Sequence, residues 1–242
     1  MAPIKKSNSY LYFFGNKKSE GKGTMREILG GKGAGLAEMT EIGINVPPGF
    51  NISTEVCDIF YKNKKALPKK IIEETEKNII KLEAMTSKGF GDPINPLLVS
   101  VRSGAMFSMP GMMDTILNLG LNDKTVNGVI KKTKNPRFAW DSYRRFIQMF
   151  SDVVLKVEKE LFEKKLEALK NKKNVRHDVD LDSNSLKQLV GEFKKIVKSK
   201  TGKNFPQDPK DQLIKAINAV FLSWNNDRAI FYRKQYDIPS EI

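Results

Sequence analysis

Arg102 and the glycines that follow it could together bind an anionic group such as a phosphate. The apolar run Leu97–Val99 leads through Arg102 into a segment that contains Gly104 and Gly111. A planar guanidinium can hold two phosphate oxygens at once, and glycines let backbone N–H groups approach an anion. Four methionines in the same segment would make an apolar, flexible flap over a ligand: Met106, Met109, Met112 and Met113. The alternative is a strand, a turn and methionines packed in the core.

Lys32 lies in a second glycine-rich segment, GGKGAG at residues 30–35. The following Leu36 and Met39 have helical spacing, and Gly43 could end that helix. The sequence therefore predicts a glycine-rich turn that opens a helix with Lys32 at or near its N-terminus, where free N–H groups favour anions. The segment fails the P-loop pattern, because the spacing differs and no Ser or Thr follows the lysine. A flexible turn with a solvated lysine is the alternative.

Five segments occur in an order that resembles the pyruvate, phosphate dikinase family. They read GGKGAGLAEM, NVPPGFNIST, GDPINPLLVSVRSGAMFSMPGMMDTILNLGLND, FAWDSYRRFIQMFSDVV and SWNNDRAIFYR. The resemblance runs from about Tyr10 to the C-terminus and is weakest across Lys156–Lys203. The related phosphoenolpyruvate synthases and glucan or water dikinases share GGKGA-like and VRSSA-like elements. The run SMPGMMDTILNLGLND is much more similar to pyruvate, phosphate dikinase than to either relative.

The resemblance implies part of the ATP-binding domain of an enzyme with several domains. That enzyme would convert ATP, phosphate and pyruvate to AMP, pyrophosphate and phosphoenolpyruvate through a histidine on a swivelling domain. In the family, the acidic ligands of Mg²⁺ and much of the adenine pocket come from the second half of the ATP-grasp domain. The chain is therefore expected to end, at Ile242, before that half, and to be inactive alone. A homodimer is left open for the full-length enzyme.

Three residues are expected to bind ATP, on the strength of the same resemblance. Lys32 and Arg102 would be ligands of the ATP phosphates, and Gly111 would lie in a phosphate-covering segment. Arg145 resembles a basic position of the docking surface for the swivelling domain. No catalytic residue and no metal ligand is expected in this chain. Phosphoryl transfer needs positioned positive charge above all, which agrees with these residue types.

Two alternative functions remain open at this stage. The first is a fragment of phosphoenolpyruvate synthase, which uses water in place of phosphate. The second is a basic module that binds nucleic acid or another polyanion, because Lys and Arg exceed Asp and Glu by 42 to 28. However, the lysines alternate with glutamates, as in VEKELFEKKLEALK, which is typical of a solvated helix. We therefore expect no nucleic-acid partner.

The lone histidine is expected to be structural or solvated, and the lone cysteine to be a small buried hydrophobic residue. His177 lies in a polar stretch without a nearby nucleophile pattern, and Cys57 lies at helical spacing with apolar neighbours. A single cysteine excludes an internal disulfide framework and favours a reducing compartment, so the cytoplasm is expected. No apolar run approaches the ~20 residues of a membrane span.

The predicted fold class is α+β, the N-terminal portion of an ATP-grasp domain. Residues 1–115 would form a mixed α/β, phosphate-binding part, and residues 116–242 a mainly helical subdomain. Strands are predicted at Leu11–Phe14, Phe50–Ile52 and Leu97–Val101. Helices are predicted to begin at Pro68, to run from Trp140 to Leu161, and to begin at Pro209 with Asp208 as the cap. Lys170–Ser185 is predicted to be a flexible connection.

Overall fold

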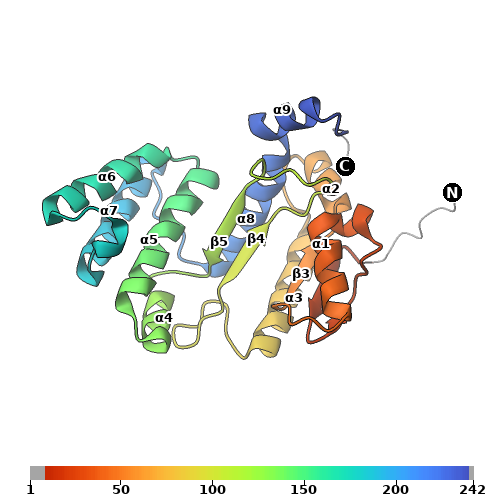
Figure 1. Cartoon of the computed structure of the whole chain (residues 1–242), viewed down its shortest axis with the longest axis horizontal. Helices are drawn as coiled ribbons and strands as arrows, with labels where there is room; N and C mark the ends of the chain where they lie inside the picture. The colour runs from red at the N-terminus through yellow and green to blue at the C-terminus, as the bar shows by residue number, and fades with distance from the viewer. Residues whose placement is uncertain (1–8, 240–242) are drawn as a thin grey trace. The chain divides into compact units, whose positions relative to one another are not determined.

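A computed structural model describes residues 9–239 as a mixture of helices and sheet, which confirms the α+β class. The described residues group into two compact units, each made of separate stretches of chain. Unit 1 contains the described residues up to Ser87, the segment Ser103–Asp114 and the described residues from Val220 onward. Unit 2 contains Lys88–Arg102 and Thr115–Ala219. The elements, as labelled in Figure 1, are β1 (Leu11–Gly15), β2 (Lys18–Ser19), α1 (Arg26–Glu41), β3 (Gly49–Ile52), α2 (Glu55–Lys62), α3 (Lys69–Thr86), β4 (Val99–Arg102), β5 (Thr115–Leu119), α4 (Thr125–Thr133), α5 (Pro136–Val153), α6 (Lys159–Lys173), η1 (Asp178–Asp180), α7 (Ser183–Thr201), α8 (Pro209–Leu222), η2 (Ser223–Asn225) and α9 (Asp227–Gln235).

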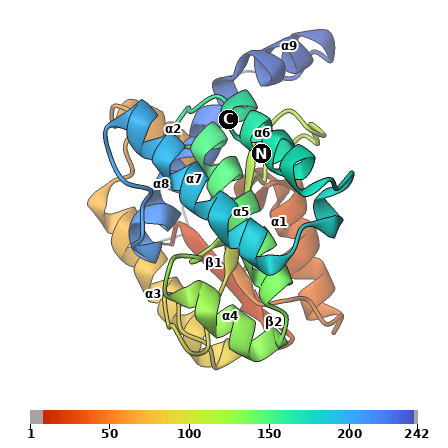
Figure 2. The same cartoon turned by 90° about the vertical axis from the view of Figure 1, so that its left-hand side faces the viewer.

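Unit 1 is built around a three-stranded antiparallel sheet in the order β2-β1-β3. The central strand β1 is aromatic and fully buried, because it is covered on both of its faces. Helices α1 and α3 both contact β1, and Figure 2 shows the two helices beside it. The sheet therefore fixes the positions of α1 and α3, the helices that carry the residues discussed below.

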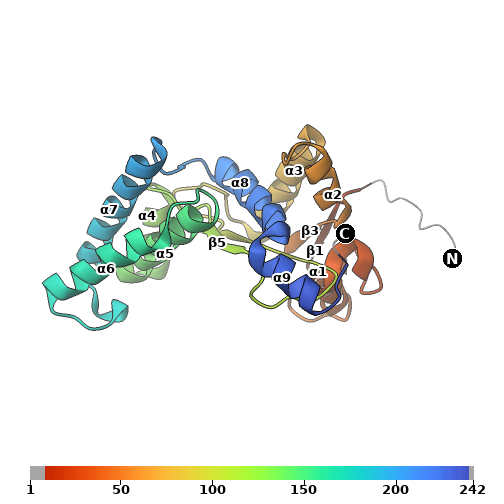
Figure 3. The same ribbon diagram turned by 90° about the horizontal axis from the view of Figure 1, so that it is seen from above.

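Unit 2 combines the antiparallel pair β4–β5 with helices that pack through aromatic side chains. Helix α5 packs against α4 and α7, and α6 packs against α7, as Figures 1 and 3 show. The rings of Phe146 and Phe150 on α5 meet Phe205 edge to face at 5.6 and 5.5 Å. Phe162 on α6 meets Phe193 on α7 at 4.9 Å. These contacts form a ring-packed core of the kind that dominates buried-area energetics.

Most of the predicted element starts are confirmed. The first two predicted strands match β1 and β3. The third begins two residues later and ends one residue later than predicted, so that Arg102 ends β4. Pro68 precedes α3, and Asp208 accepts the Lys210 N–H at the start of α8. Gly43 follows α1 with φ of +86°, and the N–H groups of Gly43 and Ile44 donate to Thr40 and Met39 carbonyls, which is a Schellman motif.

The predicted helix from Trp140 to Leu161 is wrong in both of its bounds. Helix α5 begins at Pro136, after the Asn135 side chain accepts the Phe138 N–H at 2.9 Å, and it ends at Val153. Lys156 then adopts φ of +57°, and Val157 turns back into the core. Val157 keeps the apolar spacing of α5, although it lies in the segment after the helix, where it is buried. The spacing therefore predicted a longer helix than the structure contains.

The predicted flexible connection Lys170–Ser185 is also wrong, because both of its ends are helical and Asp178 between them is hydrogen-bonded and ion-paired. Helix α6 continues to Lys173, and α7 begins at Ser183. Between them, the Asp178 carbonyl accepts from Arg137 at 2.7 Å, and the Asp178 carboxylate pairs with Lys170 at 3.3 Å. Arg137 lies on α5, 41 positions before Asp178, so the local polar composition could not reveal this contact.

The expected division at residue 115 stays a prediction about domain organisation. Thr115 begins the second stretch of unit 2, but Ser103–Asp114 and the segment from Val220 belong to unit 1. The expected end of the chain before a further half, at Ile242, lies outside the described residues. Among residues 9–239, none of the helices combines the length and the apolar character that a membrane crossing requires.

Candidate functional site

Helix α1 is interrupted at Gly30. This residue has φ of 68° and ψ of 170°, a conformation that L side chains rarely adopt. Two helical segments meet there, and Lys32 lies in the first turn of the second one. The structure therefore confirms a glycine bend before the helix that carries Lys32, and it adds a short helical segment, Arg26–Leu29, before the bend.

The bend packs directly against the backbone of the segment Ser103–Asp114, which we name the cover loop. A Cβ added to Gly30 would lie 1.1 Å from the Gly104 carbonyl oxygen, so no side chain fits. The Gly31 N–H donates to the Ala105 carbonyl at 3.1 Å. The two glycine-containing segments that the sequence predicted to bind phosphate are thus in backbone contact within unit 1, although they lie far apart in the sequence.

Lys32 reaches the first residue of the cover loop. Its Nζ donates to the Ser103 carbonyl at 3.3 Å, and its side chain is exposed to solvent. One long hydrogen bond leaves the ammonium with further N–H groups for an incoming oxygen, because lysine has three donors. Lys32 and the glycine-containing cover loop are therefore in contact within unit 1.

Gly111 lies near the far end of the cover loop in the left-handed region, with φ of +73° and exposed backbone. An added Cβ would meet nothing within 4 Å, so conformation and not crowding favours glycine here. The Met112 N–H donates to the Met109 carbonyl at 3.2 Å, and the Ser103 hydroxyl lies 2.9 Å from the Met113 sulfur. The loop is therefore folded on itself, and the predicted methionine flap is partly buried through Met109.

The end of the cover loop is tied to the C-terminal segment of unit 1. Asn226 Nδ2 donates to the Met112 carbonyl at 3.0 Å, and the Asp114 N–H donates to Ser223 Oγ at 3.1 Å. Arg228 pairs with the Asp114 carboxylate at 2.9 Å. Ser223, Asn226 and Arg228 lie in the segment SWNNDRAIFYR, for which the sequence predicted no individual roles. Its density of polar residues near an Asn cap was the available signal.

Arg233 holds this anchoring segment in place from the inside. It is 3% exposed, donates to the Trp224 carbonyl and Asn225 Oδ1, and lies 4.2 Å from the Trp224 ring centroid. Burial lowers the pKa of the Arg233 guanidinium, and burial also raises the pKa of nearby Tyr61. Moving the Arg233 side chain would leave these two acceptors without this donor, so Arg233 stabilises the positions of Trp224 and Asn225.

Arg102 and Arg145 belong to unit 2. Arg102 is the exposed last residue of β4, where it pairs across the hairpin with Thr115, and a peptide bond joins it to Ser103. Arg145 lies on α5, is exposed, and donates to Asp141 at 3.0 Å. The structure therefore brings Lys32 together with the cover loop that contains Gly111, and it gives Arg102 the strand-end position that was predicted.

His177 is exposed and Cys57 is buried, as expected. The backbone N–H of His177 donates to the Asp180 carboxylate at 3.0 Å in a capping box. Cys57 is buried, and burial raises the pKa of its thiol to about 12, so the thiol stays protonated at neutral pH. Over residues 9–239, no three His, Cys, Asp or Glu side chains are grouped as a metal site requires.

A family model described as pyruvate phosphate dikinase, AMP/ATP-binding domain, matches residues 26–75 and 64–242. The chain belongs to this family. A pyruvate, phosphate dikinase of Clostridium symbiosum is 54% identical over 226 residues, which cover 93% of this chain and 26% of that protein. Similar proteins from Zea mays (named chloroplastic) and Entamoeba histolytica are 50% and 51% identical over 96% and 92% of this chain. The chain spans about a quarter of the length of these relatives.

Proposed function

We propose that this chain supplies ATP-phosphate contacts to a pyruvate, phosphate dikinase. The complete enzyme would convert ATP, phosphate and pyruvate to AMP, pyrophosphate and phosphoenolpyruvate through a phosphohistidine. Membership of an AMP/ATP-binding domain family supports nucleotide binding. The observation that carries the location is the contact of Lys32 with the cover loop, at the point where Gly30 meets Gly104.

In this proposal, Lys32 and Arg102 are ligands of the ATP phosphates, and Gly111 lies in a segment that covers the phosphates. Lys32 would act as a point charge, and Arg102 as a planar fork that holds two oxygens. Both side chains are exposed, so both can reach a ligand. These residues would position the phosphates and offset the negative charge that develops in transfer. No residue of this chain is proposed to react covalently.

Further parts of the proposal come from the family resemblance. They are an ATP-grasp architecture, the two-part division near residue 115, and Mg²⁺ held by residues outside this chain. The swivelling phosphohistidine domain would dock near Arg145, whose exposed side chain suits such a surface. A homodimer of the full-length enzyme and a cytoplasmic location also stay predictions.

The dikinase is favoured over both alternatives. The three relatives described above are all named pyruvate, phosphate dikinase, and not phosphoenolpyruvate synthase. Lysines that could attract a polyanion are partly neutralised on their own helices, as in Lys159–Glu163 and Lys215–Asp211, each at 2.6 Å. Such pairs are typical of a solvated surface and do not mark a nucleic-acid interface.

Arg102→Lys in the full-length enzyme tests this function. Lysine keeps the charge but loses the fork, so phosphoryl transfer from ATP to the histidine should slow by about tenfold or more. Transfer between phosphoenolpyruvate and the histidine should change much less, because it uses a remote site. The two half-reactions are measured separately by isotope exchange.

Arg176→Lys is the matched control, since Arg176 is also exposed in unit 2 but lies outside the proposed site. It should leave both half-reactions unchanged. Equal slowing of both half-reactions in Arg102→Lys would indicate a folding defect and contradict the assigned role.

A further inference from the structure

Helix α2 is bound to both of the segments that hold the cover loop in unit 1. The first part of the loop packs on the bend of α1, and its last part is tied to the anchoring segment Ser223–Asn226. Both of these segments belong to unit 1, and so does α2. A helix that is bound to both segments would set the spacing between the two parts of the loop.

The N-terminal end of α2 is bound to carbonyl groups just before the bend. The Thr54 hydroxyl donates to the Glu27 carbonyl at 2.6 Å, and the Thr54 N–H donates to the Ile28 carbonyl at 2.8 Å. Thr54 is the N-cap residue of α2, yet its hydroxyl makes no cap hydrogen bond over the described length of that helix. In an uninterrupted helix the Glu27 carbonyl would accept the Gly31 N–H, which here donates to Ala105. The bend therefore directs a carbonyl to α2 and an N–H to the cover loop.

The C-terminal end of α2 is bound to Phe221, next to the anchoring segment. The Tyr61 hydroxyl donates to the Phe221 carbonyl at 3.0 Å, and the Phe60 and Phe221 ring centroids are 5.4 Å apart. Burial raises the pKa of Tyr61, so its hydroxyl keeps the proton that it donates at neutral pH. Two residues after Phe221, Ser223 Oγ accepts the Asp114 N–H at the end of the cover loop. This end of α2 is therefore joined to the far end of the loop.

Helix α2 is itself held by one buried face. Val56 and Phe60 are fully buried, and Cys57 between them is 5% exposed. The eight residues of α2 rise about 12 Å along the helix axis. Because hydrogen bonds close each turn of a helix, a short helix packed in this way keeps a fixed distance between its ends.

We propose that α2 is a brace that fixes the spacing between the two anchored parts of the cover loop, with Thr54 and Tyr61 as its positioning residues. This rests on the phosphate site proposed above, because the braced loop is the one that would cover the phosphates. Neither side chain would touch the ligand, since each acts through the carbonyl that it binds. The two hydroxyl bonds join positions 27 and 160 residues apart, so they order the fold and not α2 alone.

Amide hydrogen exchange of the ligand-free chain, followed by NMR, tests the brace without a nucleotide. Tyr61→Phe should speed exchange of the Asp114 amide by about fivefold, because the anchoring segment loses one hydrogen bond. Thr54→Val should speed exchange of the Gly31 amide by a similar factor. Unchanged exchange at both amides would overturn the proposal. An equal increase throughout unit 1 would also overturn it, because it would indicate general destabilisation.

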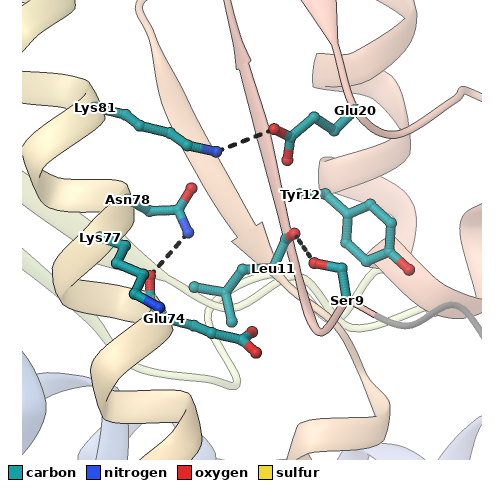
Figure 4. Close-up of a pocket in the computed structure, with 8 residues that line it drawn as sticks. All are labelled: Ser9, Leu11, Tyr12, Glu20, Glu74, Lys77, Asn78 and Lys81. Atoms are coloured by element: carbon teal, nitrogen blue, oxygen red, sulfur yellow. Dashed lines mark hydrogen bonds and ion pairs between the residues drawn. The ribbon is translucent and has the colours of Figure 1, made fainter.

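Ser9→Ala is the matched control, because it also removes a hydroxyl that donates to a backbone carbonyl in unit 1. Ser9 Oγ donates to the Leu11 carbonyl at 2.7 Å, as a dashed line in Figure 4 marks. This bond lies beside the cavity between β1 and α3, which Asn78 and Lys81 of α3 also line. It involves neither α2 nor the anchoring segment, so Ser9→Ala should leave exchange at both amides unchanged.

Triphosphate binding by the two variants, alone and combined, tests whether α2 acts as one brace. Tyr61→Phe and Thr54→Val should each weaken binding by about fivefold. The double variant should bind about as well as either single variant, because release of one end already breaks the brace. Two independent contacts would instead multiply to about 25-fold, and that result would overturn the brace.

Thr54→Ser keeps the hydroxyl and should bind the triphosphate as the wild type does. A loss equal to that in Thr54→Val would assign the effect to the methyl group and contradict the role of the hydrogen bond. Absence of triphosphate binding in the wild type would contradict the phosphate site, whereas the exchange measurement would still decide the brace.

Discussion

At the bend of α1 the backbone of Gly30 packs against the backbone of Gly104, whereas the helices of unit 2 pack through aromatic rings. Gly30 leaves no room for even a methyl group against Gly104. The pair Phe162 and Phe193, by contrast, joins α6 to α7 through rings whose centroids are 4.9 Å apart. The first contact brings peptide groups and Lys32 to one place, and the second excludes water from a core. A contact made by peptide groups tolerates no added atom, while a contact made by side chains fails when atoms are removed.

Loss of a buried ring in unit 2 is expected to have the largest effect on stability. Phe193→Ala should lower the free energy of unfolding by about 3–5 kcal/mol, because Phe193 is fully buried and a cavity remains. Denaturant unfolding followed by circular dichroism measures the change. Phe138→Ala is the control, since that ring is 51% exposed, and it should cost far less. Similar losses for both variants would show that the ring packing is not the source of stability.

An added methyl group at the bend should have the next largest effect. Gly30→Ala combines a left-handed φ with a clash against Gly104, which predicts a cost of about 2–4 kcal/mol and loss of triphosphate binding. Gly35→Ala in the same helix meets nothing within 4 Å, so it should be neutral or stabilise by up to about 1 kcal/mol. Thermal unfolding of both variants checks the contrast. Equal stability of the two would contradict the close packing of the bend.

Two asparagines that cap helices, one in each unit, are expected to differ in their effect on triphosphate binding. Asn226 caps α9 and also donates to the Met112 carbonyl, while Asn135 only caps α5. Alanine at either position should cost about 1 kcal/mol. Only Asn226→Ala should also weaken triphosphate binding in calorimetry, because the cover loop loses an anchor. Equal weakening in Asn135→Ala would mean that the effect is one of general stability.

Local patterns in the sequence predicted local structure well. Strand β1, the start of α3, the Asp208 cap and the position of Gly43 each depend on a few adjacent residues, and each is confirmed. The break after Val153 was missed, because Val157 continued the apolar spacing from a connecting segment.

The residues that contact the cover loop could not be predicted from local sequence patterns. Asn226 and Ser223 contact this loop from more than 100 positions away in the chain, and no periodicity records such a contact. Glycine content did indicate both halves of the Gly30–Gly104 contact, but only the folded chain shows that they meet. The roles of Lys32, Arg102 and Gly111 in binding ATP stay predictions.

Calorimetric titration of this chain with a nucleoside triphosphate, in wild type and Lys32→Ala, tests the central claim most directly. The wild type should bind weakly and lose affinity as salt is added, because the contacts are mainly ionic. Lys32→Ala should reduce the affinity with little change in thermal stability, since an exposed lysine contributes little to folding. Lys62→Ala, which removes another exposed lysine of unit 1, should bind as wild type does. Unchanged triphosphate binding in Lys32→Ala would contradict the account and place the phosphates elsewhere.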